Sequence, residues 1–388
     1  MGRIASIDIL RALTMVLMIF VNDLWSLQDI PAWLGHVGSG VDGIGLADTV
    51  FPAFLFIVGM SIPFAFENRR KKGDTDRDLL LHVLFRTIAL LVMGVFLVNG
   101  ESINAEATGI HRLVWNVLCC SCFIAIWNAY PKTMNAWIIL LLKILACIIL
   151  IVLAVVYRGG DEASHFSPKW WGILGLIGWS YLVSGVVGVF ARDRIRVVAI
   201  AWVLLALLSM LWHAKLVPSF LHFIPHSIIG GTEAGLTMGG VLTSMIFRYY
   251  RSRNDNKTLT ITLAGAAVAL IMLSVATRPY WGLRKLGATP AWLFLCSAFT
   301  IIAFIVIYWI VDVWGKEKWF SVIKPAGTDT LLTYLIPYYA YATTWALGIS
   351  IPAFMLYGSV GLIKSFLFAL LCVGVTWLLT KIGVRLKI

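Results

Sequence analysis

The 388-residue chain is 60% hydrophobic, has a mean hydropathy of +0.89 and carries a formal net charge of +12. Soluble domains are roughly 45–50% apolar, so this composition excludes a mainly soluble protein. Several apolar runs reach the roughly 20 residues that cross a bilayer as a helix. We therefore expect an all-α polytopic membrane protein embedded in a lipid bilayer.

The positive charge has two possible interpretations. It could serve a nucleic-acid partner, or it could reflect the usual excess of basic residues in the cytoplasmic loops of membrane proteins. Its basic residues gather in short loops between apolar runs. Cytoplasmic loops of membrane proteins carry this excess of Lys and Arg. The distribution favours membrane topology, and we expect no nucleic-acid partner.

Apolar runs bounded by charges, Gly or Pro predict twelve membrane helices. The first run is interrupted by Asp8 and Arg11 and lacks a small-residue cleavage site, so we expect a membrane helix and not a signal peptide. The twelve ranges are 7–27, 46–66, 79–98, 113–130, 134–157, 170–190, 196–213, 235–250, 259–277, 290–314, 328–347 and 359–381.

The loops predict the orientation. Loops 28–45 and 348–358 contain no Lys or Arg. Loops on the opposite side are basic, which predicts that both termini are cytoplasmic. Loop 278–289 is an exception, because it carries Arg278, Arg284 and Lys285 on the outer side and could instead be part of a site.

Five polar residues in the first helical hairpin are the strongest functional signal: Asp8, Arg11, Asn22, His36 and Asp48. An ionisable group at membrane depth costs roughly 2.5–3.5 kcal/mol on insertion scales and is a functional candidate by default. The spacing of Asp8 and Arg11 places both on one helix face, where they can form a structural ion pair or line an anion site.

His36 lies in a Gly-rich hairpin, WLGHVGSGVDGIG, at the predicted outer face. A neutral imidazole is a suitable general base for an amine or hydroxyl nucleophile. Asn22 could stabilise an oxyanion or hold the imidazole. Asp48 could orient His36, bind a cationic amine or act as a helix N-cap.

The remaining candidates carry weaker signals. Glu233 opens a helix at the outer side, where it could bind substrate or interact with the helix dipole. Cys119, Cys120 and Cys122 share one apolar helix without zinc-binding spacing, so we interpret them as buried small residues and expect no metal.

These residues resemble one known family. The pattern R-x-x-S-x-D-x-x-R, a following M-x-x-x-N, a His in a Gly-rich hairpin and A-D-x-V-F-P-x-F-x-F-I-x-G resembles the heparan-alpha-glucosaminide N-acetyltransferase family. Here it falls on Arg3, Ser6, Asp8, Arg11, Met18, Asn22, His36, Ala47, Asp48, Phe51, Pro52, Phe54, Phe56 and Gly59. Weaker similarity continues at Arg86, at GTEAGL and at GTDTLLTY, where Asp329 stands in place of the usual Asn.

The resemblance implies a transmembrane acetyltransferase that uses cytosolic acetyl-CoA and acetylates the amine of a glucosamine-type sugar on the other side. It implies a single domain over 1–388, with a signature hairpin at 3–66 and an extra helix pair at about 170–213, in a bacterial inner membrane and as a homodimer. His36 corresponds to the catalytic histidine and Asn22 to the conserved asparagine, with Asp48 beside them.

Two further residue sets follow as predictions. We expect the basic residues of the cytoplasmic side, with Asp8, to bind acetyl-CoA, and Asp48, Glu233 and Asp42 to bind the acceptor. The acetyl-CoA set is Asp8, Arg11, Arg69, Arg70, Lys71, Lys72, Arg86, Arg248 and Arg251.

The sequence leaves two other functions open. Twelve helices with both ends inside also suit an amino-sugar transporter without chemistry, although the two halves do not repeat. Because His serves amine and hydroxyl nucleophiles alike, O-acylation of an envelope polysaccharide is the other alternative.

Overall fold

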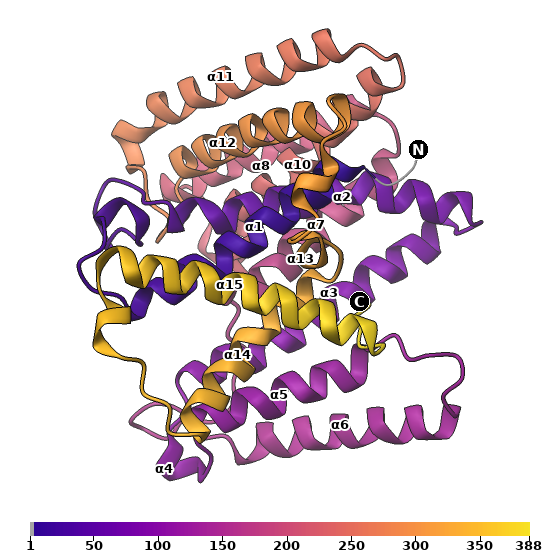
Figure 1. The fold of residues 1–388 in the computed structure, drawn as a ribbon. Helices are drawn as coiled ribbons and strands as arrows, with labels where there is room; N and C mark the ends of the chain where they lie inside the picture. The colour runs from indigo at the N-terminus through magenta and orange to yellow at the C-terminus, as the bar shows by residue number, and fades with distance from the viewer. Residues whose placement is uncertain (1–3) are drawn as a thin grey trace.

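The computed structural model describes residues 4–388, so Arg3 of the resemblance pattern lies outside the described residues. Within that range the chain is helical and contains no strand (Figure 1). Its long helices are α1 (Ala5–Asp23), α2 (Ala47–Lys71), α3 (Asp76–Glu101), α5 (Arg112–Trp127), α6 (Ala136–Val156), α7 (Ile173–Ala191), α8 (Ile195–His213), α10 (Thr232–Arg251), α11 (Asn256–Trp281), α12 (Pro290–Tyr308), α14 (Thr330–Ala346) and α15 (Gly358–Lys381).

Short helical elements connect them. A π-helical segment, η4, extends α12. The short elements are η1 (Leu24–Ser26), η2 (Ala32–Leu34), α4 (Ala105–Thr108), η3 (Ser219–Leu221), α9 (His226–Ile229), η4 (Trp309–Val313), η5 (Glu317–Phe320), α13 (Lys324–Thr328) and η6 (Ala353–Leu356).

Each of the twelve ranges predicted from sequence overlaps one long helix. In the described residues, nine helices are long and apolar enough to cross a membrane. The other three are α5 with 16 residues, α14 with 17 and the more polar α10. The all-helical membrane architecture is therefore confirmed, while a total of twelve spans stays a prediction.

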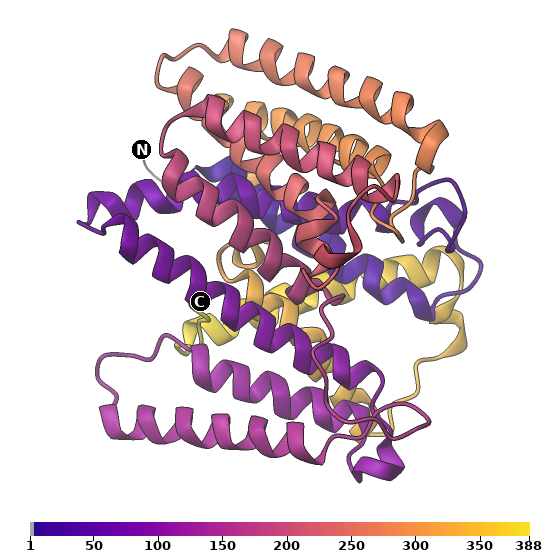
Figure 2. The same cartoon turned by 180° about the vertical axis from the view of Figure 1, so that it is seen from behind.

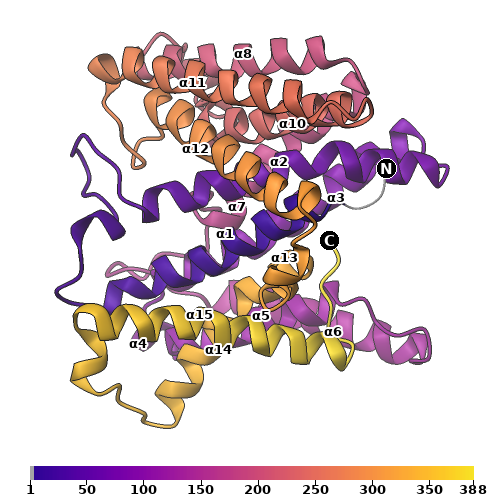
Figure 3. The same cartoon turned by 45° about the horizontal axis from the view of Figure 1, so that its top comes forward.

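The helices form three groups. Figure 3 shows α8, α10, α11 and α12 on one side and α5, α6 and α14 on the other, with α1, α2 and α7 between them. The start of α1, the α2–α3 turn and the C-terminus all lie at one end of the bundle (Figures 1 and 2). This arrangement agrees with termini on a shared side, whose identity as cytoplasmic stays a prediction.

Helix α10 is enclosed by other helices, and this environment can accommodate its polar residues. Of its residues, Thr232 to Val241 are all buried. It packs directly on the backbone of α2: a Cβ at Gly59 would overlap the carbonyl oxygen of Thr237, and one at Gly240 would overlap that of Phe56. Small residues allow this close approach between membrane helices.

We predict that Gly59→Ala destabilises the protein, because the added methyl forces α2 and α10 apart. Overpacking of this kind costs about 1–3 kcal/mol or more. Thermal unfolding of the detergent-purified protein measures the effect. The matched control is Gly265→Ala in α11, where an added Cβ meets nothing within 4 Å; equal stability of the two variants would contradict the packing account.

The prediction that three cysteines of one helix are buried is confirmed. Cys119, Cys120 and Cys122 are buried in α5. Within residues 4–388, no group of three His, Cys, Asp or Glu side chains is placed to hold a metal ion.

Candidate functional site

His36 and Asp48 form a hydrogen-bonded pair at the start of α2. The Nδ1 atom of His36 lies 2.7 Å from Oδ1 of Asp48. Asp48 is 2% exposed, and its Oδ2 atom accepts hydrogen bonds from the backbone N–H groups of Val37 (3.0 Å) and Gly45 (3.1 Å). An ionised carboxylate only accepts hydrogen bonds, so Nδ1 of His36 carries a proton, and in the neutral imidazole Nε2 is then the nitrogen with the lone pair.

The hairpin backbone sets this geometry. Helix α2 begins at Ala47 with Leu46 as its N-cap, so the N-cap interpretation of Asp48 is wrong. Instead the carboxylate lies in the first turn and folds the hairpin onto the helix. A Cβ at Gly45 would overlap the carbonyl oxygen of Gly35, so only glycine permits this close approach between the two segments of the hairpin.

A cavity of about 230 Å³, here called the histidine cavity, gathers several predicted site residues. Its polar lining comprises Asn22 from the end of α1, His36 from the hairpin, Glu233 from α10 and Lys285 from the loop between α11 and α12. Trp171 and Trp292 are among its aromatic lining residues. Asn22, His36 and Glu233 are thus brought together as predicted.

One of these polar groups, the Glu233 carboxylate, has unused hydrogen-bonding capacity. Glu233 is 5% exposed, and its Oε2 atom has no hydrogen-bond partner in the described part of the chain. Buried polar atoms are nearly always paired, so an unpaired carboxylate oxygen in a cavity is suited to a ligand that donates a hydrogen bond or carries a positive charge.

Asp42 has a different place from that predicted. It does not line the histidine cavity. Its carboxylate accepts from Arg278 Nε at 3.0 Å and from the Leu283 N–H at 2.7 Å. The Leu283 N–H and the Arg278 guanidinium hold the pKa of Asp42 below its ordinary value. Asp42 therefore clamps the hairpin to the loop between α11 and α12.

The structure also places Lys285 in this site, although the sequence predicted no role for Lys285 itself. Its Nζ atom lies 3.2 Å from Nδ1 of His36 and 3.8 Å from Oδ1 of Asp48. Burial lowers the pKa of the Lys285 ammonium, while the nearby Asp48 carboxylate acts in the opposite direction. The one signal in the sequence was the unusual run of basic residues in an outer loop.

A larger cavity of about 430 Å³, here called the basic cavity, lies toward the other end of α1 and α2. Arg11, Arg69 and Arg86 line it together with Tyr181 and other residues. The Arg86 guanidinium lies 4.8 Å from the centre of the Tyr181 ring, and its buried Nε atom has no hydrogen-bond partner in the described residues.

The ion pairs of the basic cavity hold two of its arginines in place. Arg11 donates to Asp8 (3.2 Å), to the Gly327 carbonyl (3.0 Å) and to Ser61 Oγ (2.5 Å). Arg69 pairs with Asp74 at 2.7 Å. Asp8 itself does not line the cavity.

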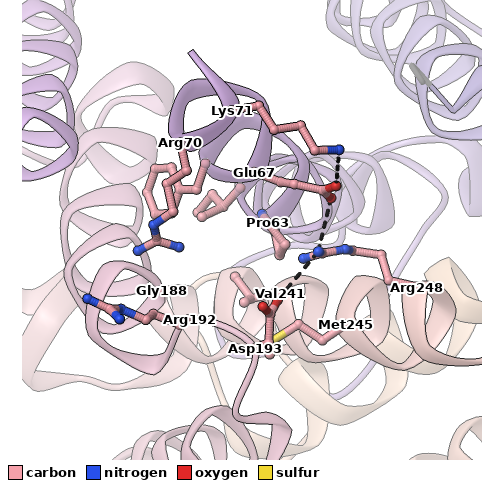
Figure 4. Close-up of a pocket in the computed structure, with 12 residues that line it drawn as sticks. Pro63, Glu67, Arg70, Lys71, Gly188, Arg192, Asp193, Val241, Met245 and Arg248 are labelled. Atoms are coloured by element: carbon pink, nitrogen blue, oxygen red, sulfur yellow. Dashed lines mark hydrogen bonds and ion pairs between the residues drawn. The ribbon is translucent and has the colours of Figure 1, made fainter. Parts of the chain in front are cut away.

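The other basic candidates occupy different places. Arg70, Lys71 and Arg248 line a separate pocket of about 280 Å³ between α2, α7 and α10 (Figure 4). Figure 4 shows Lys71 and Arg248 both directed at Glu67, with Arg248 also reaching Asp193. Arg70 pairs with Asp76 at 3.0 Å.

Two further basic candidates, Arg251 and Lys72, line none of these three cavities. Arg251 donates to the Tyr308 hydroxyl at 3.2 Å, and Lys72 is an exposed residue at the end of α2. The basic set predicted from sequence is therefore divided: Arg11, Arg69 and Arg86 share the basic cavity, and Arg70, Lys71 and Arg248 share the separate pocket.

The histidine and basic cavities meet inside the bundle. Met18 of α1 and Ile173 of α7 line both of them. Arg11 and Asn22 are eleven residues apart on α1, which corresponds to about 17 Å along the helix axis. Two cavities, one lined by arginines and the other by His36, thus adjoin along α1 at these two apolar side chains.

Comparison with known proteins places the chain in a family. Residues 3–209, more than half of the chain, match the model described as "Domain of unknown function (DUF5009)". The chain belongs to the DUF5009 family. The hairpin that holds Asn22, His36 and Asp48 lies inside the matched DUF5009 region, whereas Glu233 and Lys285 lie beyond it.

Curated relatives of this DUF5009 chain carry a functional name. The mouse heparan-alpha-glucosaminide N-acetyltransferase is 33% identical over 102 residues, and the human protein of the same name is 31% identical over 101 residues. Each match covers 25% of this chain and 14% of the relative. The family resemblance drawn from the sequence pattern is confirmed by these matches.

Proposed function

We propose that this chain is a membrane acetyltransferase of the bacterial cytoplasmic membrane. It moves an acetyl group from acetyl-CoA at the cytoplasmic face to the amine of a glucosamine-type sugar at the outer face. One observation carries the proposal: His36, which is hydrogen-bonded to Asp48, lines one cavity, three arginines line a second, and both cavities share Met18 and Ile173. The names of the partial relatives support the same reaction class.

The basic cavity suits the donor. Acetyl-CoA carries phosphates at one end of a long flexible arm and its thioester at the other. Arg11, Arg69 and Arg86 supply guanidinium groups, which bind phosphate well. The unpaired Nε atom of Arg86 is a donor that a bound anion would satisfy. The arm would then have to pass Met18 and Ile173 to present its thioester in the histidine cavity.

The histidine cavity suits the acceptor and its proton chemistry. An acceptor ammonium loses two protons on its way to the amide: one ends on the sulfur of the leaving CoA, and the other goes to solvent. The Nε2 atom of His36 takes a proton from the amine nitrogen, and Asp48 stabilises the imidazolium that results. Asn22 donates a hydrogen bond to the carbonyl oxygen as it gains negative charge.

Two routes use these same residues. In the first, the amine nitrogen attacks the thioester carbonyl carbon directly, and the C–S bond breaks. In the second, Nε2 of His36 first takes the acetyl group and the amine then attacks acetyl-His36, which gives ping-pong kinetics. Product inhibition patterns distinguish them.

We predict that Arg86→Met raises the KM for acetyl-CoA about tenfold or more and leaves the KM for glucosamine unchanged. A hydrogen bond to a charged group contributes about 1.5–3 kcal/mol, and tenfold corresponds to about 1.4 kcal/mol. The matched control is Arg192→Met, an exposed arginine of the separate pocket in Figure 4. Equal effects of the two substitutions would contradict a donor site in the basic cavity.

The function itself is tested by CoA release from acetyl-CoA, using purified protein in detergent with glucosamine as acceptor. The proposal predicts release that requires glucosamine and yields N-acetylglucosamine. Uptake of unmodified sugar into proteoliposomes without acetyl-CoA would replace it by transport. Turnover with a hydroxyl acceptor but no amine would replace it by O-acylation.

A further inference from the structure

The loop between α11 and α12 is fixed on three sides. The carboxylate of Asp42 holds Leu283 and Arg278, and the Gly43 N–H donates to the Leu283 carbonyl at 3.0 Å. The carbonyl oxygen of Gly287 lies 2.8 Å from His213 Nε2 on α8. Thr232, the neighbour of Glu233 on α10, donates its hydroxyl to the Ala288 carbonyl at 2.6 Å. The loop is therefore a rigid support between the hairpin and α10.

This loop places the ammonium group of Lys285 beside the His–Asp pair. Lys285 lies between the fixed points Leu283 and Gly287, and its side chain is 25% exposed. Its Nζ atom is close to both His36 Nδ1 and Asp48 Oδ1, at 3.2 and 3.8 Å. The other basic residue of the loop behaves differently, because Arg284 directs Nη2 to the Trp281 carbonyl at 2.9 Å.

We propose that Lys285 is a positioning residue of the acetyl transfer: its ammonium pairs with Asp48 and repels a second proton on His36, so that Nε2 returns to its basic form after each turnover. The inference rests on the proposed function and adds a residue outside the matched family region. Lys285 acts through His36 and needs no contact with the reacting atoms.

Charge balance around His36 supports this role. The titratable groups that face it are Asp48 from α2 and Lys285 from the loop, and Glu233 from α10 lines the same cavity. The Asp48 carboxylate stabilises an imidazolium, and without an opposing charge it would retain the proton taken from the amine. The Lys285 ammonium opposes this attraction at short range, where charges interact strongly. The proton is then passed on to the leaving thiolate or to water.

The experiment compares Lys285→Met, Lys285→Arg and Arg284→Gln with wild type in the CoA-release assay between about pH 5 and 9. For Lys285→Met we expect kcat to fall about 10- to 100-fold, a part of the 10²–10⁴-fold that a general base contributes. The acid limb of its kcat profile should move to higher pH by about one unit or more, as for loss of a charge within 4–6 Å. Lys285→Arg should recover most of the rate, and Arg284→Gln should match wild type.

Other outcomes overturn the inference. Unchanged kcat and an unchanged profile in Lys285→Met would remove Lys285 from the reaction. A raised KM for glucosamine at unchanged kcat would make it an acceptor-binding residue. A loss of rate that Lys285→Arg does not recover, with no movement of the pH profile, would make it structural. Absence of turnover in wild type would instead overturn the proposed function itself.

Discussion

Replacing His36 by Ala should abolish acetyl transfer while leaving acetyl-CoA binding intact. In the described residues, His36 is the side chain of the histidine cavity that is hydrogen-bonded to Asp48. Its second ring nitrogen, Nε2, is left to take the proton of the acceptor. Loss of a general base lowers kcat by about 10²–10⁴-fold, and loss of a covalent acceptor removes the second route entirely. CoA release measures the rate, and equilibrium binding of labelled acetyl-CoA measures the donor site.

The matched control for this variant is His165→Ala. His165 is an exposed histidine in the loop between α6 and α7 and does not line the histidine cavity. It should keep wild-type turnover. Retained turnover in His36→Ala, or lost donor binding, would contradict the assignment of His36 to chemistry.

Replacing Glu233 by Gln should raise the KM for glucosamine strongly, because the amide keeps the shape of the side chain but loses its charge. The buried Oε2 atom has no partner within residues 4–388 and lines the cavity that holds His36. Removing one member of a buried charge pair costs about 2–5 kcal/mol, which corresponds to a roughly 30-fold or larger loss of acceptor affinity. The KM for acetyl-CoA should stay unchanged.

Steady-state kinetics with glucosamine tests this, and Glu101→Gln is the control. Glu101 is an exposed carboxylate at the end of α3 and does not line the histidine cavity. If Glu233→Gln lowered the turnover of an uncharged hydroxyl acceptor and of glucosamine equally, the carboxylate would not be recognising the amine.

The sequence predicted the helices well because membrane helices are encoded locally. Hydrophobic length alone located all twelve ranges, including that of α10. It could not show that α10 is enclosed by protein, since this depends on the contact of Gly59 and Gly240 with the facing backbone. Polar residues in that helix therefore resembled a weak membrane span.

The site was predictable only where its residues are close in sequence. Asn22, His36 and Asp48 come from one hairpin, and the structure gathers them as expected with Glu233 in reach of the same cavity. Lys285 comes from a loop 249 positions away from His36, so its proximity depends on tertiary packing. Asp42 was assigned to substrate binding, but its partners are Arg278 at the end of α11 and Leu283 in that same distant loop.

For a related reason, the sequence did not show which residues of the predicted acetyl-CoA set lie together. Positive-inside loops place many basic residues on one face, and charge alone does not show which cavity each of them lines. The structure separates Arg11, Arg69 and Arg86 from Arg70, Lys71 and Arg248.

The central claim is that acetyl-CoA and the acceptor sugar reach the site from opposite sides of the membrane. The most direct test reconstitutes the protein into sealed vesicles with labelled acetyl-CoA enclosed and glucosamine outside. The account predicts labelled N-acetylglucosamine outside the vesicles, CoA inside, and neither product with His36→Ala. Turnover that occurs only when acetyl-CoA and glucosamine share one compartment would contradict it.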